Sequence, residues 1–281
     1  MPAPHRPRHG AGLVPDADRP YAQRERSIGD ASRGMSVAKW PITKPVLGLA
    51  ALMVMAAGIA CGDETGADTS IATPSTVMGQ TRTLELPAPD TEGQVSLEEA
   101  IRDRRSIRDY TDGPLSLIEL GQLLWAAQGI TSDREARAAP SAGGTYPLEL
   151  YVAAGRVTGL EPGVYRYLPH EHALDLVTAG DVRGTLMEAS LGQTWVGDCA
   201  AGVIVAAVYE RTMERYGERG IRYVHMEAGH AAQNLCLQAV ALGLGAVPVG
   251  AFADEQIQAV AGLAADEQPL YVIPVGRPQA P

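Results

Sequence analysis

The sequence has too few cysteines and too little positive charge for several common classes of protein. Three Cys among 281 residues can form neither a disulfide scaffold nor, by themselves, a closed zinc site. Lys and Arg number 23 against 33 Asp and Glu, a net charge of −10, so the chain lacks the basic field that would hold a nucleic-acid backbone. No heptad pattern or internal repeat is present. With 46% hydrophobic residues, what remains is an ordinary globular protein without a nucleic-acid partner.

The N-terminal sixty residues contain a charge-free run that is short for a membrane-spanning helix. Residues 46–60 make 15 residues without a charge, whereas a spanning helix needs about 20 apolar residues. Lys39 and Lys44 precede the run and Cys61 follows it, which is the layout of a secretory signal. A cysteine after small residues resembles a bacterial lipobox, in which the thiol is acylated, although that motif usually has Leu where Gly58 stands.

These features predict three segments. Residues 1–60 form a leader in which translation starts at Met35, residues 61–92 a flexible polar tether, and residues 93–281 the globular domain. The mature protein is then exported and held at the membrane of the cell envelope by a lipid on Cys61. Secretion without a lipid, an uncleaved anchor, and a core helix with a chance cysteine are the alternatives. If there is no signal, the protein is cytoplasmic.

Two helix starts within the domain are marked by the S-x-x-E capping box, at Ser96 and at Ser116. The second helix carries leucines on one side and ends at Gly129. Apolar or alternating strand patterns and further helices follow, and their order predicts an α+β fold. We expect strands at 148–154, 163–168, 173–177, 202–208, 246–249 and 270–275, and helices near 181–191, 221–242 and 254–263.

An arginine cluster lies where the first helix should end. It consists of Arg104, Arg105, Ser106 and Arg108. Three guanidinium groups this close repel one another unless an anion joins them, and the forked donors of Arg suit a phosphate group. A solvated helix face paired with Asp103 and Asp109 is the alternative.

A glycine-rich loop, residues 140–147, reads PSAGGTYP. Its small residues let backbone amides approach a flat ligand, and Ser141 and Thr145 can donate to or accept from ring heteroatoms. It is not a phosphate-binding P-loop, because the spacing and the lysine of that motif are absent. An ordinary turn that leads into a strand is the alternative.

Seven sequence blocks, taken in order, resemble those of a known family. They are RRSIRDY, LLWAAQGI, PSAGGTYPLELYV, GVYRYLPHEHAL, RYGERGIRYVHMEAGHAAQNLCLQAVALGLG, PVGAF and PLYVIPVGRP. Over residues 93–278 the chain resembles the nitroreductase superfamily and, more narrowly, its SagB/ThcOx-type dehydrogenase branch. The resemblance implies a nitroreductase-like fold with a central, mainly antiparallel sheet flanked by helices. It also implies a homodimer that binds FMN noncovalently at the subunit interface.

The same resemblance implies which residues contact the cofactor. Arg104 and Ser106, assisted by Arg105, match contacts to the phosphate group. Arg108 matches a basic residue near the N1/O2 edge, where a cation stabilises reduced flavin. The remaining positions match the loop along the isoalloxazine ring, the segment facing N5, and a second phosphate contact. They are Pro140, Ser141, Ala142 and Gly143; Val249, Gly250 and Ala251; and Arg277.

Arg215 and Tyr216 stand where azoline-oxidising members of this branch have a catalytic Lys-Tyr pair. The chain contains no lysine after Lys44. Arginine is a poor general base because its pKa is above about 12, whereas Tyr216 can donate a hydrogen bond or a proton.

No metal site is predicted, although two histidines lie close together in the sequence. His225 and His230 are separated by about 500° of helical rotation, so their side chains diverge. We expect instead that Glu227, His230 and Asn234 form a buried polar stripe that fixes the long helix to the glycine-rich loop.

The sequence therefore predicts an FMN-dependent oxidoreductase. It would pass hydride between a reduced donor, NAD(P)H or a quinone, and a small or peptidic acceptor. An azoline dehydrogenase of modified peptides is the alternative within enzymes. A surface lipoprotein that kept the fold as a binding module without the cofactor is the alternative outside them.

Overall fold

The computed structural model describes residues 83–279. The leader predicted at residues 1–60, the lipid attachment predicted at Cys61 and most of the tether predicted at residues 61–92 lie outside this range. Within it, no helix has both the length and the apolar character that crossing a bilayer requires.

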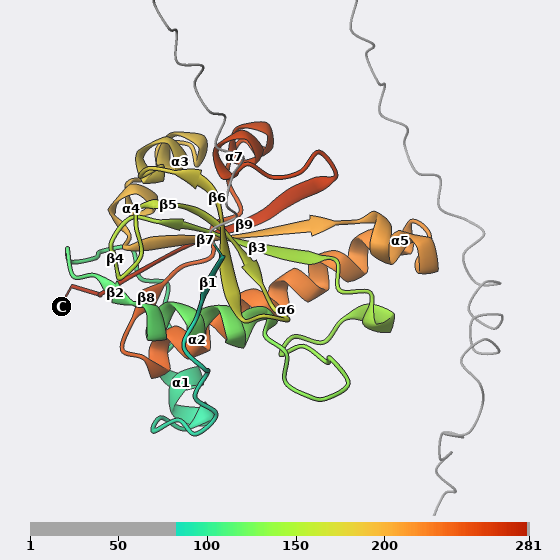
Figure 1. Cartoon of the computed structure of the whole chain (residues 1–281), viewed down its shortest axis with the longest axis horizontal. Coiled ribbons are helices and arrows are strands. Elements are labelled where there is room, and N and C mark those ends of the chain that lie inside the picture. Colours follow the sequence, from blue (N-terminus) through green and yellow to red (C-terminus); the bar gives the residue numbers. More distant parts are fainter. Residues whose placement is uncertain (1–82, 280–281) are drawn as a thin grey trace, which may run out of the picture. The chain divides into compact units, whose positions relative to one another are not determined.

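A seven-stranded sheet forms the centre of the described part (Figure 1). Its strand order is β1-β6-β5-β3-β7-β9-β8, and every neighbouring pair is antiparallel. The strands are β1 (Thr83–Glu85), β3 (Leu148–Ala154), β5 (Gly163–Leu168), β6 (Ala173–Ala179), β7 (Ala201–Val208), β8 (Gly245–Ala246) and β9 (Glu267–Gly276). Two short strands, β2 (Leu115–Ser116) and β4 (Val157–Thr158), pair in parallel beside it. The predicted α+β fold with a mainly antiparallel sheet is confirmed.

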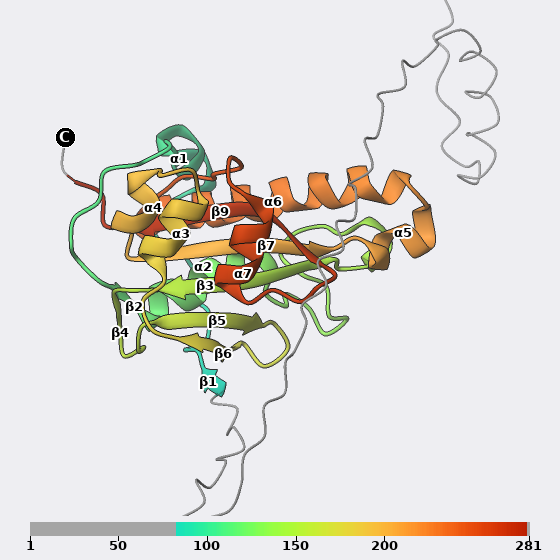
Figure 2. The ribbon, with the colours of Figure 1, turned by 90° about the horizontal axis from the view of Figure 1, so that it is seen from above.

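Helices cover both faces of the sheet (Figures 1 and 2). On one face α2 (Leu117–Gln128) packs against the long helix α6 (Arg219–Ala241), and α1 (Leu97–Asp103) lies on α6. On the other face are α3 (Arg183–Ala189), α4 (Thr194–Asp198) and α7 (Asp254–Ala261). The short helix α5 (Glu210–Tyr216) leads into α6, and a single 3-10 turn, η3 (Ala142–Gly144), lies in the glycine-rich loop.

The central strands have an apolar side chain on each face because helices cover both. In β3, Leu150 and Val152 belong to the core beneath α2 and α6, whereas Tyr151 and Ala153 belong to the core beneath α3 and α7. All eight residues of β7 are buried. Because successive side chains of a strand point to opposite faces of the sheet, one run of apolar residues contributes to both cores.

Both predicted helix starts are confirmed. The Ser96 hydroxyl accepts a hydrogen bond from the Glu99 amide, and Ser116 forms a complete capping box with Glu119. The second helix ends at Gly129, as predicted, where a Cβ would collide with the Trp125 ring. Local capping chemistry therefore sets the bounds of α2 from its own sequence.

The capping box of α2 gives a stability prediction. We expect Ser116→Ala to lower the free energy of unfolding by about 1 kcal/mol, because the amide of Glu119 loses its acceptor. Urea denaturation measures the change. Ser96→Ala is the matched control: its hydroxyl forms one exposed bond, so its effect should be smaller. An equal or larger loss in the Ser96 variant would contradict the assignment.

The elements that were not predicted from the sequence include α5, α4 and β1. Helix α5 buries only Thr212, so its sequence has no apolar period to detect. Helix α4 is a five-residue turn. Strand β1 pairs with β6 inside the range 61–92, for which a tether is predicted. Beyond it Leu86 is buried, and His172 Nε2 lies 3.0 Å from the carbonyl oxygen of Pro87, so the packed chain begins before residue 93.

Candidate functional site

The arginine cluster lies on the segment that follows α1 and pairs with β8. Ser106 forms a parallel bridge with Ala246, and the Ile107 amide donates to the Ala246 carbonyl over 3.2 Å. The Ile107 side chain packs where a Cβ on Gly245 would be only 2.6 Å away, so this position must be glycine. Because Ile107 points into the fold, its exposed neighbours Ser106 and Arg108 point outward.

No arginine of the cluster has a carboxylate partner among the described residues. Arg102 donates two hydrogen bonds of 2.8 and 2.9 Å to the carboxylate of Asp103. Asp109 forms no ion pair among the described residues. Of the alternative interpretation, pairing with Asp103 and Asp109, the structure retains an attraction between Arg105 and Asp103, which helps to lower the pKa of that carboxyl. The half-buried Arg104 guanidinium has no acceptor among the described residues.

The other two arginines of the cluster form no ion pair among the described residues, although Arg105 is near enough to Asp103 to help lower the pKa of that carboxyl. Arg105 Nη1 donates to two backbone carbonyls, those of Arg102 at 2.9 Å and Arg104 at 2.8 Å. The Arg108 guanidinium lies 5.3 Å from the ring centroid of Trp195 in a cation–π contact. Arg108 and Trp195 also line a polar cavity of about 490 Å³, which contains no residue of the glycine-rich loop.

The segment after β8 brings backbone donors to the same end of the fold. Val249 is buried and exchanges hydrogen bonds of 2.8 and 2.9 Å with Val272. The next residues, Gly250 and Ala251, are exposed, and their N–H groups have no acceptor among the described residues. The Ala251 carbonyl accepts from Gln193 Nε2 over 2.8 Å, which fixes this segment against the end of α3.

Arg277 lies apart from this group. Its Nη2 atom is 2.8 Å from each carboxylate oxygen of Glu119, the residue that completes the capping box of α2. A second anion contact at Arg277 would have to compete with this ion pair. The structure thus gives Arg277 a partner that accounts for its presence.

The glycine-rich loop forms a second group of predicted site residues. Gly143 has φ +64° inside η3, a conformation that favours glycine. The Ser141 hydroxyl accepts from the Tyr146 amide over 2.9 Å. Thr145 and Thr212 share a hydrogen bond of 2.8 Å between their hydroxyls, which ties the loop to α5.

The predicted catalytic pair lies directly against this loop. Arg215 Nη1 donates to the Gly143 carbonyl over 3.1 Å, and a Cβ on Gly143 would lie 2.6 Å from the Tyr216 hydroxyl. The Tyr216 ring packs edge-on against Tyr223, with centroids 5.1 Å apart. The structure therefore joins two groups of residues that are about seventy positions apart in the sequence.

Helix α6 places a carboxyl group beneath the loop. Glu227 is 2% exposed, and burial raises its pKa to about 7, although hydrogen bonds from the Ser141 hydroxyl and the Ala142 amide act in the opposite direction. Asn234 Nδ2 reaches the Ala138 carbonyl over 3.4 Å, whereas His230 is exposed. The predicted stripe is therefore wrong for His230, because the loop covers α6 only on either side of it.

Two contacts at the loop were missed because their residues lie outside the recognised motifs. The Arg137 guanidinium lies 5.0 Å from the ring centroid of Tyr146, and burial lowers the Arg137 pKa. Arg211 Nη1 donates to the Tyr146 carbonyl over 3.0 Å and pairs with Glu149 over 2.7 Å. Only the folded arrangement of β3 and α5 reveals these anchors.

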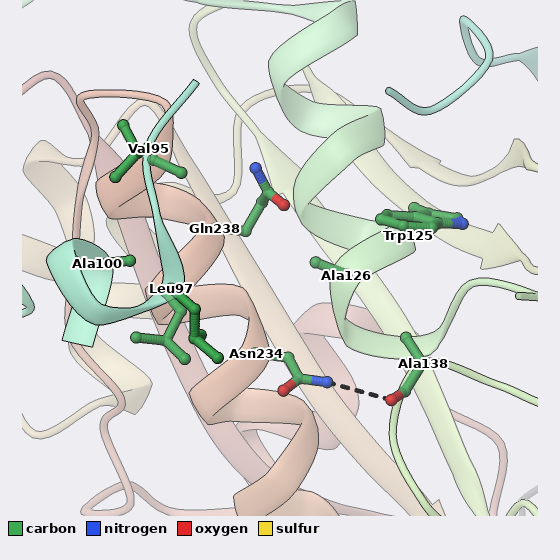
Figure 3. A pocket seen from close by; sticks show the side chains of 10 residues that line it. Val95, Leu97, Ala100, Trp125, Ala126, Ala138, Asn234 and Gln238 are labelled. Atoms are coloured by element: carbon green, nitrogen blue, oxygen red, sulfur yellow. Dashed lines mark hydrogen bonds between the residues drawn. The ribbon is translucent and has the colours of Figure 1, made fainter. Parts of the chain in front are cut away.

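The two groups lie toward opposite ends of α6 within one chain (Figure 1). The loop and α5 lie near its first half, β8 follows its last turn, and Arg104 lies close enough to Cys236 to act on the pKa of that thiol. From Glu227 to Cys236 the helix rises about 14 Å. A groove of about 310 Å³ lies between them (Figure 3). It is lined by Val95, Leu97, Ala100, Trp125, Ala126, Ala138, Asn234, Leu237, Gln238 and Ala241.

Comparisons of sequence and of structure with known proteins both find nitroreductases. The Nitroreductase family profile matches residues 101–277. A Methanocaldococcus jannaschii protein named as a nitroreductase is 47% identical over 195 residues, 69% of this chain and 97% of that protein. A Ralstonia eutropha crystal structure, also described as a nitroreductase, matches with TM-score 0.63 and 32% identity over 71% of this chain and 91% of that one.

A further relative is named for the processing of trifolitoxin. The trifolitoxin-processing protein TfxB of Rhizobium leguminosarum bv. trifolii is 35% identical over 119 residues. The match covers 41% of this chain and 32% of TfxB. The family profile spans both groups of site residues described above.

Proposed function

The chain belongs to the nitroreductase family of oxidoreductases, and we propose that it binds FMN and transfers hydride between a reduced donor and a small or peptidic acceptor. The observation that carries the proposal is the arginine cluster. In a chain with net charge −10, three neighbouring arginines have no carboxylate partner among the described residues. Forked donors that form no ion pair within the chain fit a phosphate group.

The other donors at this end of the fold fit the rest of FMN. The Ser106 hydroxyl can join Arg104 and Arg105 at the phosphate group, and Arg108 supplies a cation for the N1/O2 edge. The N–H groups of Gly250 and Ala251, which have no acceptor among the described residues, can donate to the edge of the ring that carries N5. When bound, FMN supplies two-electron transfer as hydride at N5.

The glycine-rich loop enters the proposal through a second copy of the chain. The part of α6 beneath the loop, at Glu227, is about 14 Å along the helix from Cys236, beside which Arg104 lies, so the two halves of the predicted site are apart within one subunit. A homodimer would bring the loop of one subunit to the arginine cluster of the other and place each flavin at the interface. Exposed apolar side chains on α1 and α6, such as Leu97 at 61% and Met226 at 52%, are consistent with a covered surface there.

Arg215 and Tyr216 receive different roles. The Tyr216 hydroxyl lies at the surface of the loop beside Gly143, where it can donate a hydrogen bond or a proton to a substrate. The Arg215 guanidinium group donates a hydrogen bond to the Gly143 carbonyl. Because it stays protonated, Arg215 cannot act as a base. We therefore assign Arg215 to orienting the loop and an electron-rich acceptor.

The partial match to TfxB favours a peptide as acceptor, as in a SagB/ThcOx-type dehydrogenase. The donor would be NAD(P)H or, for a protein anchored outside the cytoplasm through Cys61, a membrane quinone. The mass of the mature N-terminus, isolated from fractionated cells, tests the lipid anchor.

We expect the purified chain to be yellow and to contain one FMN per subunit. Absorbance and the mass of the released cofactor test this directly. Turnover with a nitroarene, a quinone and a heterocyclised peptide then separates a general reductase from an azoline dehydrogenase. A colourless protein that cannot take up FMN would overturn the proposal and favour a non-catalytic binding module.

A further inference from the structure

Glu227 is a buried acid that the proposed reaction does not use. It lies on the inner side of α6, 2% exposed, beneath the glycine-rich loop. A carboxylate in such a place is costly unless donors surround it. Two donors are present, the Ser141 hydroxyl and the Ala142 amide, and both belong to residues predicted to face the flavin.

The hydrogen bonds around Glu227 have a fixed direction. The Ser141 oxygen accepts from the Tyr146 amide, so its own proton is free to point at Glu227. On the other side of the turn, the Gly143 carbonyl accepts from Arg215. The turn is thus held between the carboxyl group of Glu227 on α6 and the guanidinium group of Arg215 on α5.

One carboxylate oxygen of Glu227 is buried without a hydrogen-bond donor in the described part of the chain. Its Oε1 atom is buried and has no hydrogen-bond partner among the described residues. An ionised oxygen without a donor is unfavourable there, whereas a protonated one would carry no charge. The unpaired oxygen is therefore a place where a proton can reside.

The groups around Glu227 have opposing effects on its ionised and protonated forms. Arg137 is the charged group that acts on Glu227 from the segment before the loop, and it favours the ionised form, as do Ser141 and Ala142. Burial outweighs them and brings the pKa of Glu227 to about 7. On α6 itself His225 is engaged by the Tyr209 hydroxyl at 2.6 Å, and the nearby His230 is exposed.

We propose that Glu227 is a proton-dependent positioning residue for the glycine-rich loop: ionised, it fixes the turn through Ser141 and Ala142, and protonated at Oε1, it releases the turn. The proton is exchanged with solvent and no other bond changes. Because charge-assisted hydrogen bonds are about twice as strong as neutral ones, protonation weakens both restraints together. Through Gly143, the turn also positions Arg215 and Tyr216.

The test follows the turn itself in the full chain, with and without added FMN. Glycine labelled with ¹⁵N reports Gly143 and Gly144, whose amide signals are recorded from about pH 5 to 9. In the wild type both signals should shift with one midpoint near 7. In Glu227→Gln the shift should be lost. Wild-type signals that do not titrate, or a midpoint that persists in the variant, would overturn the proposal.

Two further variants separate Glu227 from its neighbours. His230→Gln removes the exposed histidine of the same helix and should leave the midpoint unchanged. Ser141→Ala removes a donor that favours the ionised form, so the midpoint should rise. If Glu227→Gln does not fold, this rise still tests the proposal, and an unchanged midpoint in Ser141→Ala contradicts it.

The stability of the chain supplies an independent readout. Because the pKa of Glu227 in the folded state lies above its ordinary value, ionisation opposes folding, and stability should fall as pH rises from about 4.5 to 7. The melting temperature of Glu227→Gln should lack this component. Its presence at full size in Glu227→Gln would contradict the assignment of the proton to this group.

The consequence for turnover rests on the proposed function. With FMN bound, kcat/KM should show an inflection at the same midpoint, which Glu227→Gln removes while it keeps its flavin. If the glycine signals titrate as expected but no FMN binds, the proposed function fails and the role of Glu227 in the turn stands. If FMN binds and turnover occurs without titration of the glycine signals, the reverse holds.

Discussion

Replacing Arg104 and Arg108 together by Ala should abolish retention of FMN through purification. Each guanidinium is expected to contribute a charge-assisted contact of about 1.5 to 3 kcal/mol. Loss of both should raise the dissociation constant by about 10² to 10⁴. Neither side chain has an ion-pair partner among the described residues, so the fold should be little affected. Quenching of FMN fluorescence on titration with protein measures the affinity.

Arg102→Ala is the matched control for this double substitution. Arg102 lies on the same segment but is committed to Asp103 over 2.8 Å and to Glu99 over 3.5 Å. Its removal should leave the affinity for FMN nearly unchanged. A double variant that binds FMN as tightly as the wild type would show that the cofactor lies elsewhere. Equal losses in the Arg102 variant would mean that general charge, and no built site, attracts the flavin.

The secondary structure was most predictable where chemistry within one segment decides it. The capping boxes at Ser96 and Ser116 and the apolar run of β7 needed no knowledge of the rest of the chain. Helix α5 is the opposite case, because its polar sequence is stabilised by contacts with α6 and η3. Strand β1 likewise exists through its pairing with β6. Elements that depend on partners distant in the sequence leave little local pattern.

The candidate residues of the site were predicted from motifs, but the way in which the fold groups them was not. Sequence order gave no sign that Gly143 lies against Arg215 and Tyr216, or that Arg104 of the arginine cluster lies near Cys236 in the second half of α6. Helical spacing placed His230 in the buried stripe, whereas only the loop's path over α6 determines that it is exposed. Spacing along one helix determines which way a side chain points, whereas its burial depends on which other segment packs over that face.

Gly143→Ala should lower kcat by about 10- to 100-fold if Arg215 and Tyr216 serve the reaction. The added Cβ would lie 2.6 Å from the Tyr216 hydroxyl and 3.0 Å from Arg215 Nη1, so both side chains must move. A displacement of about 1 Å is enough for a loss of this size when a group has to be oriented. The φ angle of +64° adds a backbone cost of about 1 to 2 kcal/mol.

Gly144→Ala separates the two effects of that substitution. Gly144 has nearly the same φ, +66°, but its Cβ would meet nothing closer than Tyr146 Cε2 at 4.0 Å. Both variants should therefore lose similar stability in thermal denaturation, whereas only Gly143→Ala should lose most of its turnover. If the two variants lose turnover equally, backbone strain in the loop explains the effect. The contact between the loop and α5 would then have no part in the reaction.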